Sequence, residues 1–162
     1  MELGGEQSLC GYLKSKPGRK LSENEARHIF RQLVEGTKYL HEKHIVHRDL
    51  KLENALIDGE KNIKIIDFGF SVSTKKEEIL KNFCGTPSYM APEIVTRKEY
   101  NGMYADVWAL GVMLYIMLSG KLPFSGNIIR LSRVYSSSDE KVLETESYTT
   151  KLPDALLRDL KM

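Results

Sequence analysis

Cysteine is scarce in this sequence, and its N-terminus lacks the pattern of a secretory signal peptide. The two cysteines, Cys10 and Cys84, are not spaced as metal ligands. The first nine residues are glycine-rich and then acidic, whereas a signal peptide has a basic segment followed by an apolar one. These features predict a reducing compartment: the cytoplasm or, as the second choice, the nucleus.

Long apolar runs and long blocks of one charge sign are also absent. The longest apolar run, Val107 to Leu118, falls well short of the roughly 20 residues that span a bilayer, so a buried helix is expected there. The 24 Lys and Arg residues nearly balance the 22 Asp and Glu residues, so no nucleic-acid or membrane partner is predicted. The 41% share of apolar residues suffices for the core of one domain or a large part of one.

Two segments have the residue pattern of long helices. Ser22, with Glu25 three residues later, forms a capping box, and apolar residues then recur at helical spacing as far as Leu40. The second segment, Met103 to Ser119, is almost wholly apolar, and Gly120 directly after it is typical of a helix end. Both segments are predicted to be core helices.

A β-hairpin is predicted between these helices. Residues 55–57 and 63–66 are short β-favouring runs, and Asp58-Gly59 between them is a turn candidate. Such a hairpin would bring Asn54, before the first strand, near Asp67, after the second. One amide oxygen and one carboxylate would then converge. Hard oxygen ligands shared with substrate phosphates are how proteins usually hold Mg²⁺.

Three short motifs occur in order around this hairpin. Residues 47–54 read His-Arg-Asp-Leu-Lys-Leu-Glu-Asn, residues 67–69 read Asp-Phe-Gly, and residues 91–93 read Ala-Pro-Glu. In this order and spacing they resemble the signature motifs of eukaryotic Ser/Thr protein kinases. The alternative is a hairpin whose Asp and Asn are only turn and cap residues, but several motifs rarely coincide in order. The block from Cys84 to Glu93 is most similar to the calmodulin-dependent and AMP-activated kinase group.

The resemblance implies an α+β fold that is mainly α, namely a kinase large lobe with a small catalytic β-hairpin. By this resemblance, residues 1–162 form a partial kinase domain that extends from the hinge to the start of the late helices of the large lobe. The polar segment 127–150 matches the family poorly. A glycine-rich G-x-G-x-x-G loop does not occur in these residues, so the small lobe is expected to be absent.

Four residues would carry the chemistry that the resemblance implies. Asp49 would orient the substrate hydroxyl and take its proton, and Lys51 would neutralise the γ-phosphate. Asn54, in the same loop, and Asp67 would hold the Mg²⁺ ions that bridge the phosphates of ATP. A lysine at position 51 resembles Ser/Thr kinases rather than tyrosine kinases.

Other residues would bind adenine or support the catalytic loop. Glu2 and Gly4 belong to the expected hinge, whose backbone groups face the adenine, and Leu56 would join the apolar column beneath that ring. His47 is expected to pack beneath Phe68 and to anchor the loop, without a role in proton transfer. These roles come from the resemblance alone.

Asp106 opens the apolar helix near the C-terminal end of the matched region. Burying this carboxylate without a partner would cost several kcal/mol. In the family, the matching aspartate accepts hydrogen bonds from backbone N–H groups of the catalytic loop. The same role is expected here.

Residues 67–93 resemble an activation segment. Thr86 would hydrogen-bond toward the catalytic Asp and Lys and couple substrate docking to catalysis. Arg48 matches the arginine that pairs with a phosphothreonine on this segment in many kinases. That threonine commonly lies two residues before the Cys, where this chain has Asn82, so the usual on-switch is not expected. Glu93 is expected to lack the arginine that usually pairs with it.

Two functions of different classes follow. The first is a Ser/Thr protein kinase, which would transfer the γ-phosphate of ATP to protein Ser/Thr hydroxyls and would need the small lobe to be active. The second is a non-catalytic kinase fragment that binds substrates or partners. Expected partners are protein substrates, together with an upstream kinase or a regulatory subunit.

Overall fold

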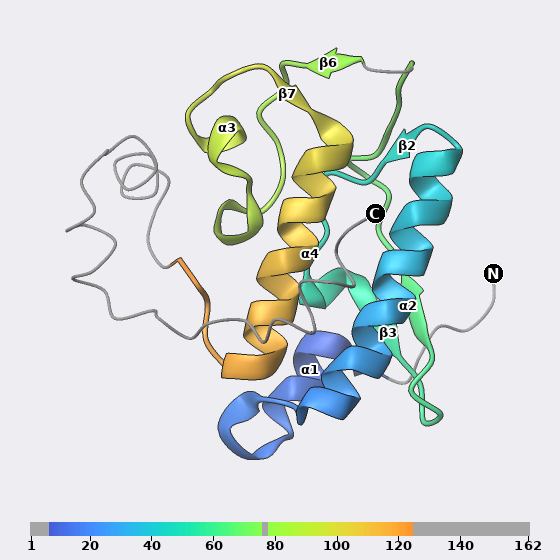
Figure 1. Cartoon of the computed structure of the whole chain (residues 1–162), viewed down its shortest axis with the longest axis vertical. Helices are drawn as coiled ribbons and strands as arrows, with labels where there is room; N and C mark the ends of the chain where they lie inside the picture. Colours follow the sequence, from blue (N-terminus) through green and yellow to red (C-terminus); the bar gives the residue numbers. More distant parts are fainter. Residues whose placement is uncertain (1–6, 76–77, 125–162) are drawn as a thin grey trace.

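Two long helices form the centre of the fold. The computed structural model describes residues 7–75 and 78–124, and within them α2 (Glu23–Glu42) and α4 (Gly102–Ser119) pack side by side (Figure 1). Three features expected from the sequence lie outside the described residues: Glu2, Gly4 and the polar segment 127–150.

Helix α2 begins where the sequence predicts it. The Ser22 hydroxyl accepts a hydrogen bond from the Glu25 N–H at 3.4 Å, and acidic side chains in the first turn suit the helix dipole. The apolar face of α2, which includes Ile29 and Phe30, is buried in the main core. The prediction of a core helix over this segment is confirmed.

Helix α4 is apolar on all sides and lies in the interior. The Asn101 side chain caps it by accepting the Met103 N–H at 2.9 Å, and Gly120 ends it in a left-handed conformation (φ 73°) that favours glycine. Among the described residues it is the one helix whose length and hydropathy would suit a membrane, yet 56% of it is buried inside the protein. An evenly apolar helix in that setting is a core helix, as predicted.

The predicted hairpin is formed by β3 (Ala55–Ile57) and β4 (Ile63–Ile65), which pair in antiparallel register with Leu56 opposite Lys64. The Asp58 carboxylate closes the loop by accepting the N–H groups of Glu60 at 2.9 Å and Asn62 at 2.8 Å. The hairpin prediction is confirmed. A third strand that the sequence did not predict, β1 (Gln7–Ser8), pairs with β3, giving the order β1-β3-β4.

Two further ladders pair strands that follow the hairpin with strands next to the two long helices. Strand β2 (Ile45–Val46) pairs with β5 (Val72–Ser73), and β6 (Ile79–Leu80) pairs with β7 (Tyr100–Asn101). The sequence predicted only the two hairpin strands, because a two-residue strand is too short to show an alternating pattern. The remaining elements are short helices and 3-10 turns: α1 (Leu9–Lys14), Pro17–Arg19, Leu52–Asn54, Pro87–Tyr89 and α3 (Pro92–Val95).

The apolar side chains form two clusters. The larger lies among α1, α2, α4 and the hairpin, and its largest fully buried members are Leu9, Ile29, Phe30, Leu33, Ile57, Leu110, Met113, Leu114 and Met117. The smaller joins β6, β7 and the start of α4 to the residues in and before α3, and it contains Leu80, Met90, Ala91, Ile94, Val95, Tyr100 and Ala105. The catalytic-loop candidates lie where these two clusters meet, at the N-terminal part of α4.

Candidate active site

Asp106 of α4 holds the loop that precedes the hairpin. Its carboxylate is buried, with 1% of the residue exposed, and accepts the backbone N–H groups of His47 and Arg48, both at 2.9 Å. A third partner is His41 of α2, whose Nε2 lies 2.9 Å from Asp106 Oδ2. With three partners, this buried carboxylate avoids the cost of lost hydration. The resemblance implied the backbone partners of Asp106, whereas nothing in the sequence predicted its contact with His41.

The His47 ring fastens this loop to the end of the hairpin. The Asp49 N–H donates to Nδ1 at 3.3 Å, so the proton is assigned to Nε2, which donates to the Ile66 carbonyl at 3.0 Å. The ring centre lies 5.0 Å from that of Phe68, and His47 is fully buried. Both ring nitrogens therefore bond to the backbone, which is a structural arrangement.

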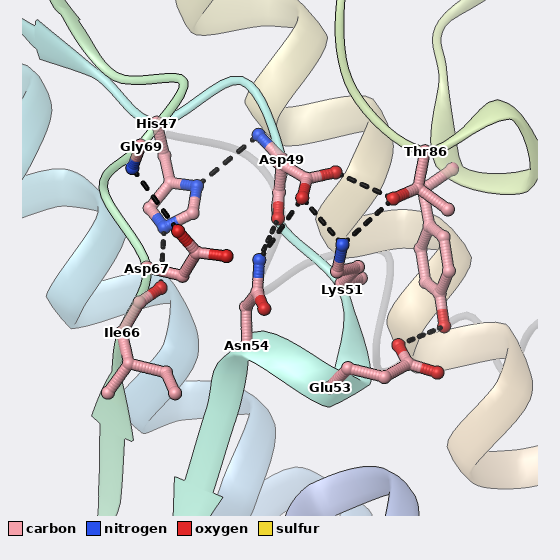
Figure 2. A network of polar contacts seen from close by, with 10 residues as sticks. His47, Asp49, Lys51, Glu53, Asn54, Ile66, Asp67, Gly69 and Thr86 are labelled. Atoms are coloured by element: carbon pink, nitrogen blue, oxygen red, sulfur yellow. Dashed lines mark hydrogen bonds and ion pairs between the residues drawn. The ribbon is translucent and has the colours of Figure 1, made fainter.

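Asp49, Lys51 and Thr86 form a closed triangle of polar contacts (Figure 2). Asp49 Oδ2 lies 2.6 Å from Lys51 Nζ, and Asp49 Oδ1 accepts the Thr86 hydroxyl at 2.7 Å. The Lys51 ammonium also donates to the Thr86 oxygen at 3.0 Å. Asp49 is only 4% exposed, so these contacts form in a partly dehydrated site, where electrostatic interactions are stronger than in water.

Asn54 and Asp67 lie at the same end of the hairpin. The Asn54 carbonyl accepts the Ile66 N–H at 2.9 Å, which places Asp67 one residue beyond this pairing. The Asn54 amide nitrogen donates to the Asp49 carbonyl at 2.9 Å and to Oδ2 at 3.2 Å, so its amide oxygen is directed away from Asp49. The Asp67 carboxylate, exposed to solvent, accepts the Gly69 N–H at 3.3 Å.

This donor set fits Mg²⁺ carried by phosphates better than a metal held by protein alone. In the described residues there is no group of three or more His, Cys, Asp or Glu side chains that could hold a metal ion. Asn54 and Asp67 offer one amide oxygen and one carboxylate. Mg²⁺ commonly takes one or two protein ligands and completes its shell with water and phosphate oxygens.

Two residues of this site have left-handed backbone conformations that are costly for non-glycine residues. Arg48 has φ 66° and Asp67 has φ 63°. Such conformations cost about 1–3 kcal/mol each and cluster at functional sites, where neighbouring contacts enforce them. For Arg48 the enforcing contacts include the Asp106 carboxylate and the Phe70 carbonyl, which accepts the Arg48 Nε–H at 2.6 Å.

The activation segment approaches Arg48 near Asn82. The Tyr100 hydroxyl donates to the Asn82 carbonyl at 2.9 Å. Burial raises the pKa of Tyr100, the Cys84 thiol raises it further, and the Arg48 guanidinium opposes the rise. The Asn82 backbone, the Tyr100 hydroxyl and the Arg48 side chain therefore share one neighbourhood, and the Asn82 residue is exposed.

The resemblance to protein kinases implies that Asn82→Thr, once phosphorylated, raises peptide phosphorylation by a form of the protein that includes a kinase small lobe. A phosphate would bring a charge of about −1.5 to −2 toward Arg48 and would form charge-assisted hydrogen bonds. Activity is measured before and after treatment with an upstream kinase, with the Asn82 parent treated identically as the control. No gain over that parent would show that position 82 is not a vacated switch.

Gly85, directly before Thr86, has no room for a side chain. Its φ of 108° favours glycine, and an added Cβ would lie 2.6 Å from the Arg48 carbonyl oxygen. We expect Gly85→Ala to displace Thr86 and to destabilise the protein, by about 1–3 kcal/mol in chemical denaturation. Gly111→Ala is the control, because a Cβ there meets nothing within 4 Å. Equal stabilities of the two variants would refute the steric argument.

A groove of about 450 Å³ borders Thr86 on the side of α1. Glu53 and Tyr89 line it, and the Tyr89 hydroxyl lies 3.5 Å from a Glu53 carboxylate oxygen. Burial raises the pKa of Tyr89, and the Glu53 charge raises it further. The same two causes, in the same order, raise the pKa of the Cys10 thiol in this groove. Sequence reasoning gave Glu53 no role, because its place in the groove follows from packing, whereas Tyr89 belongs to the stretch 85–89 that was expected to dock substrates.

The other site residues predicted from the sequence occupy less central positions. Leu56 is half-buried in β3 between Ser8 and Lys64. Phe68 is 44% exposed although one side of its ring contacts His47. Among the described residues no ion pair involves the Glu93 carboxylate, and the expectation about its usual partner stays a prediction.

Comparison with known proteins gives a family and several close relatives. Residues 1–159 match the family model described as "Protein kinase domain". NUAK family SNF1-like kinase 1 of Mus musculus is 48% identical over 134 residues, which cover 80% of this chain and 20% of that protein. CBL-interacting serine/threonine-protein kinase 8 of Arabidopsis thaliana is 47% identical over 130 residues, covering 80% and 29%. Serine/threonine-protein kinase SIK1 of Rattus norvegicus is 53% identical over 106 residues, covering 65% and 14%. The chain spans less than a third of the length of each of these relatives.

Proposed function

The chain belongs to the protein kinase family, and from this premise we propose that it transfers the γ-phosphate of ATP to protein Ser/Thr hydroxyls. The NUAK, CBL-interacting and SIK relatives are Ser/Thr kinases of the AMP-activated-kinase-related group, which confirms the predicted family and group. The observation that supports the proposal best is the triangle of Asp49, Lys51 and Thr86 beside Asn54.

Asp49 is proposed as the acceptor of the substrate proton. Its carboxylate is fixed from two sides, by Lys51 and Asn54 at Oδ2 and by Thr86 at Oδ1. A substrate hydroxyl that replaced the Thr86 contact or approached beside it would be oriented for attack and would pass its proton to an Asp49 oxygen. Phosphoryl transfer depends mostly on such positioning and on electrostatics.

Lys51 and Thr86 are proposed to couple substrate docking to this centre. The Lys51 ammonium bonds both to the carboxylate and to the Thr86 oxygen, so a movement of the docking segment changes the position of the cation. The groove that borders Thr86 would receive the substrate segment next to the acceptor residue. By the resemblance to kinases, a lysine at position 51 and a threonine at position 86 favour Ser or Thr as the acceptor residue.

Asn54 and Asp67 are proposed to bind Mg²⁺, with ATP as the phosphoryl donor. Bound Mg²⁺ would neutralise charge on the phosphates. The hydrogen bond from the Asn54 amide to Asp49 keeps its oxygen available, and the left-handed backbone at Asp67 orients that carboxylate at the end of the hairpin. Leu56 would contact the adenine ring, as would Glu2 and Gly4.

Partners of the protein are proposed from the same chemistry. Substrates would be proteins with Ser or Thr acceptors, and an upstream kinase or a regulatory subunit would act on the activation segment. The cytoplasmic or nuclear location remains a prediction. The alternative, a docking module without catalysis, would bind substrate segments in the groove and transfer no phosphate.

We expect these 162 residues by themselves to bind Mg²⁺–ATP weakly. They contain no glycine-rich loop, which in kinases covers the phosphates, so these residues by themselves offer few donors to the phosphates of ATP. Isothermal calorimetry should give a dissociation constant above about 1 mM or no measurable heat. An affinity in the micromolar range would overturn this expectation.

The catalytic proposal itself is tested in a form that includes a kinase small lobe. Matched peptides that differ only in a Ser, Thr or Tyr acceptor are incubated with Mg²⁺–ATP, and phosphate incorporation is measured. Transfer to the Ser and Thr peptides, with little to the Tyr peptide, is expected. Peptide binding without transfer would favour the docking module.

A further inference from the structure

Tyr100 joins the activation segment to the rest of the protein through its hydroxyl. It is 3% exposed and lies in β7. The hydroxyl donates to the Asn82 carbonyl at 2.9 Å, across a gap of 18 residues in the chain. This bond holds the backbone of Asn82, the position at which the resemblance to kinases would place a phosphothreonine.

The segment that Tyr100 holds lies directly against the catalytic loop, since a Cβ added at Gly85 would be 2.6 Å from the Arg48 carbonyl oxygen. The Arg48 guanidinium and the Cys84 thiol are charged and polar neighbours of the Tyr100 hydroxyl, and they act in opposite directions on the pKa of Tyr100. Arg48 is fixed by its backbone bond to Asp106 and by its side-chain bond to the Phe70 carbonyl at 2.6 Å. Tyr100 therefore lies between a rigid arginine and the segment that carries Thr86.

The β6–β7 ladder and one ion pair also connect this part of the activation segment to β7 and its neighbours. In the β6–β7 ladder Leu80 is the partner of Tyr100, and the Leu80 side chain is buried in the smaller core cluster. Lys81 pairs with Glu99 at 2.7 Å, but both side chains are mostly exposed, and such pairs contribute little. The ladder ends at Leu80. Beyond it, the Phe83 ring packs against the smaller core cluster and beneath the Arg97 guanidinium, 4.8 Å from the ring centre, whereas the Asn82 backbone itself is held by the Tyr100 hydroxyl.

We infer that Tyr100 is a positioning residue whose hydroxyl holds the activation segment beside Arg48 without a phosphate at position 82. The inference rests on the proposed kinase function. A phosphate would provide the same link through charge-assisted bonds to Arg48. Here a neutral hydroxyl and a backbone carbonyl form it, which explains how an asparagine is compatible with an ordered segment. Docking of substrate near Thr86 would then not depend on phosphorylation of residue 82.

The structural part is tested by hydrogen exchange on the 162-residue chain. Tyr100→Phe removes the hydroxyl and keeps the ring in the core. Tyr104→Phe is the matched control, because Tyr104 is 72% exposed. We expect the hydrogen-bonded amides of the β6–β7 ladder, which ends beside this bond, to exchange roughly 2- to 10-fold faster in Tyr100→Phe and to be unchanged in the control. Equal exchange in the two variants would overturn the inference.

The functional part uses a form with a kinase small lobe and asks whether a phosphate replaces the hydroxyl. Tyr100→Phe should lower peptide phosphorylation, mainly through a higher KM, and phosphorylated Asn82→Thr in the same background should restore it. A merely structural loss in the core would not be rescued in this way. Failure of the rescue would refute the inference, whereas absence of transfer in every variant would refute the kinase function and leave the exchange result intact.

Discussion

Asp49→Asn is expected to lower the rate of phosphoryl transfer by about 10²–10⁴-fold in a form of the protein that includes a kinase small lobe. The amide has nearly the shape of the carboxylate but cannot take a proton from the substrate hydroxyl. It also loses the negative charge that holds the Lys51 ammonium at 2.6 Å. The loss should therefore appear in kcat, with the fold retained.

His47→Ala is the comparison that separates chemistry from structure. The ring is fully buried, and both of its nitrogens bond to backbone groups, so its removal leaves a cavity and two unsatisfied groups. We expect a lower free energy of unfolding, with a smaller loss of activity per folded molecule than in Asp49→Asn. Thermal unfolding and kinetics are measured on the same preparations. The assignment of roles is wrong if His47→Ala lowers kcat per folded molecule as much as Asp49→Asn does.

The parts of the fold that the sequence predicted are those with a long or distinctive pattern. Helix α2 is long enough for its N-cap and its helical periodicity to agree, α4 has a long apolar run that ends at a glycine, and the hairpin has two apolar runs around a turn. Strands β1, β2 and β5–β7 have two residues each, so their pairing is set by tertiary packing and leaves no local signal. For the same reason the sequence could not indicate that β6 holds the activation segment against β7.

The candidate site likewise contains residues that the sequence predicted and residues that only the structure shows. Asp49, Asn54 and Asp67 are adjacent to one hairpin, so local sequence and motif order were enough to bring them together. His41 and Tyr100 contact the same site from other elements, at separations of 65 and 18 residues from their partners. Neither belongs to a motif, and only the packing of α2 and β7 against the loop reveals them.

Asp106→Ala is expected to destabilise the 162-residue chain by about 3–5 kcal/mol, because it leaves buried donors without an acceptor. The carboxylate accepts two backbone N–H groups of the catalytic loop and contacts the His41 ring, all at 2.9 Å. After the substitution these donors have neither the carboxylate nor free access to water. The catalytic loop should loosen together with the whole domain, since Asp106 lies in the central helix.

Asp58→Ala provides a matched control for this effect. The Asp58 carboxylate also accepts two backbone N–H groups, at 2.9 and 2.8 Å, but it lies in the exposed loop of the hairpin, where water replaces a lost acceptor. Urea denaturation of both variants, followed by circular dichroism, should show a large drop in the midpoint for Asp106→Ala and a small one for Asp58→Ala. Two similar midpoints would mean that burial of the Asp106 contacts does not set their contribution, and the proposed anchoring of the catalytic loop to α4 would have to be abandoned.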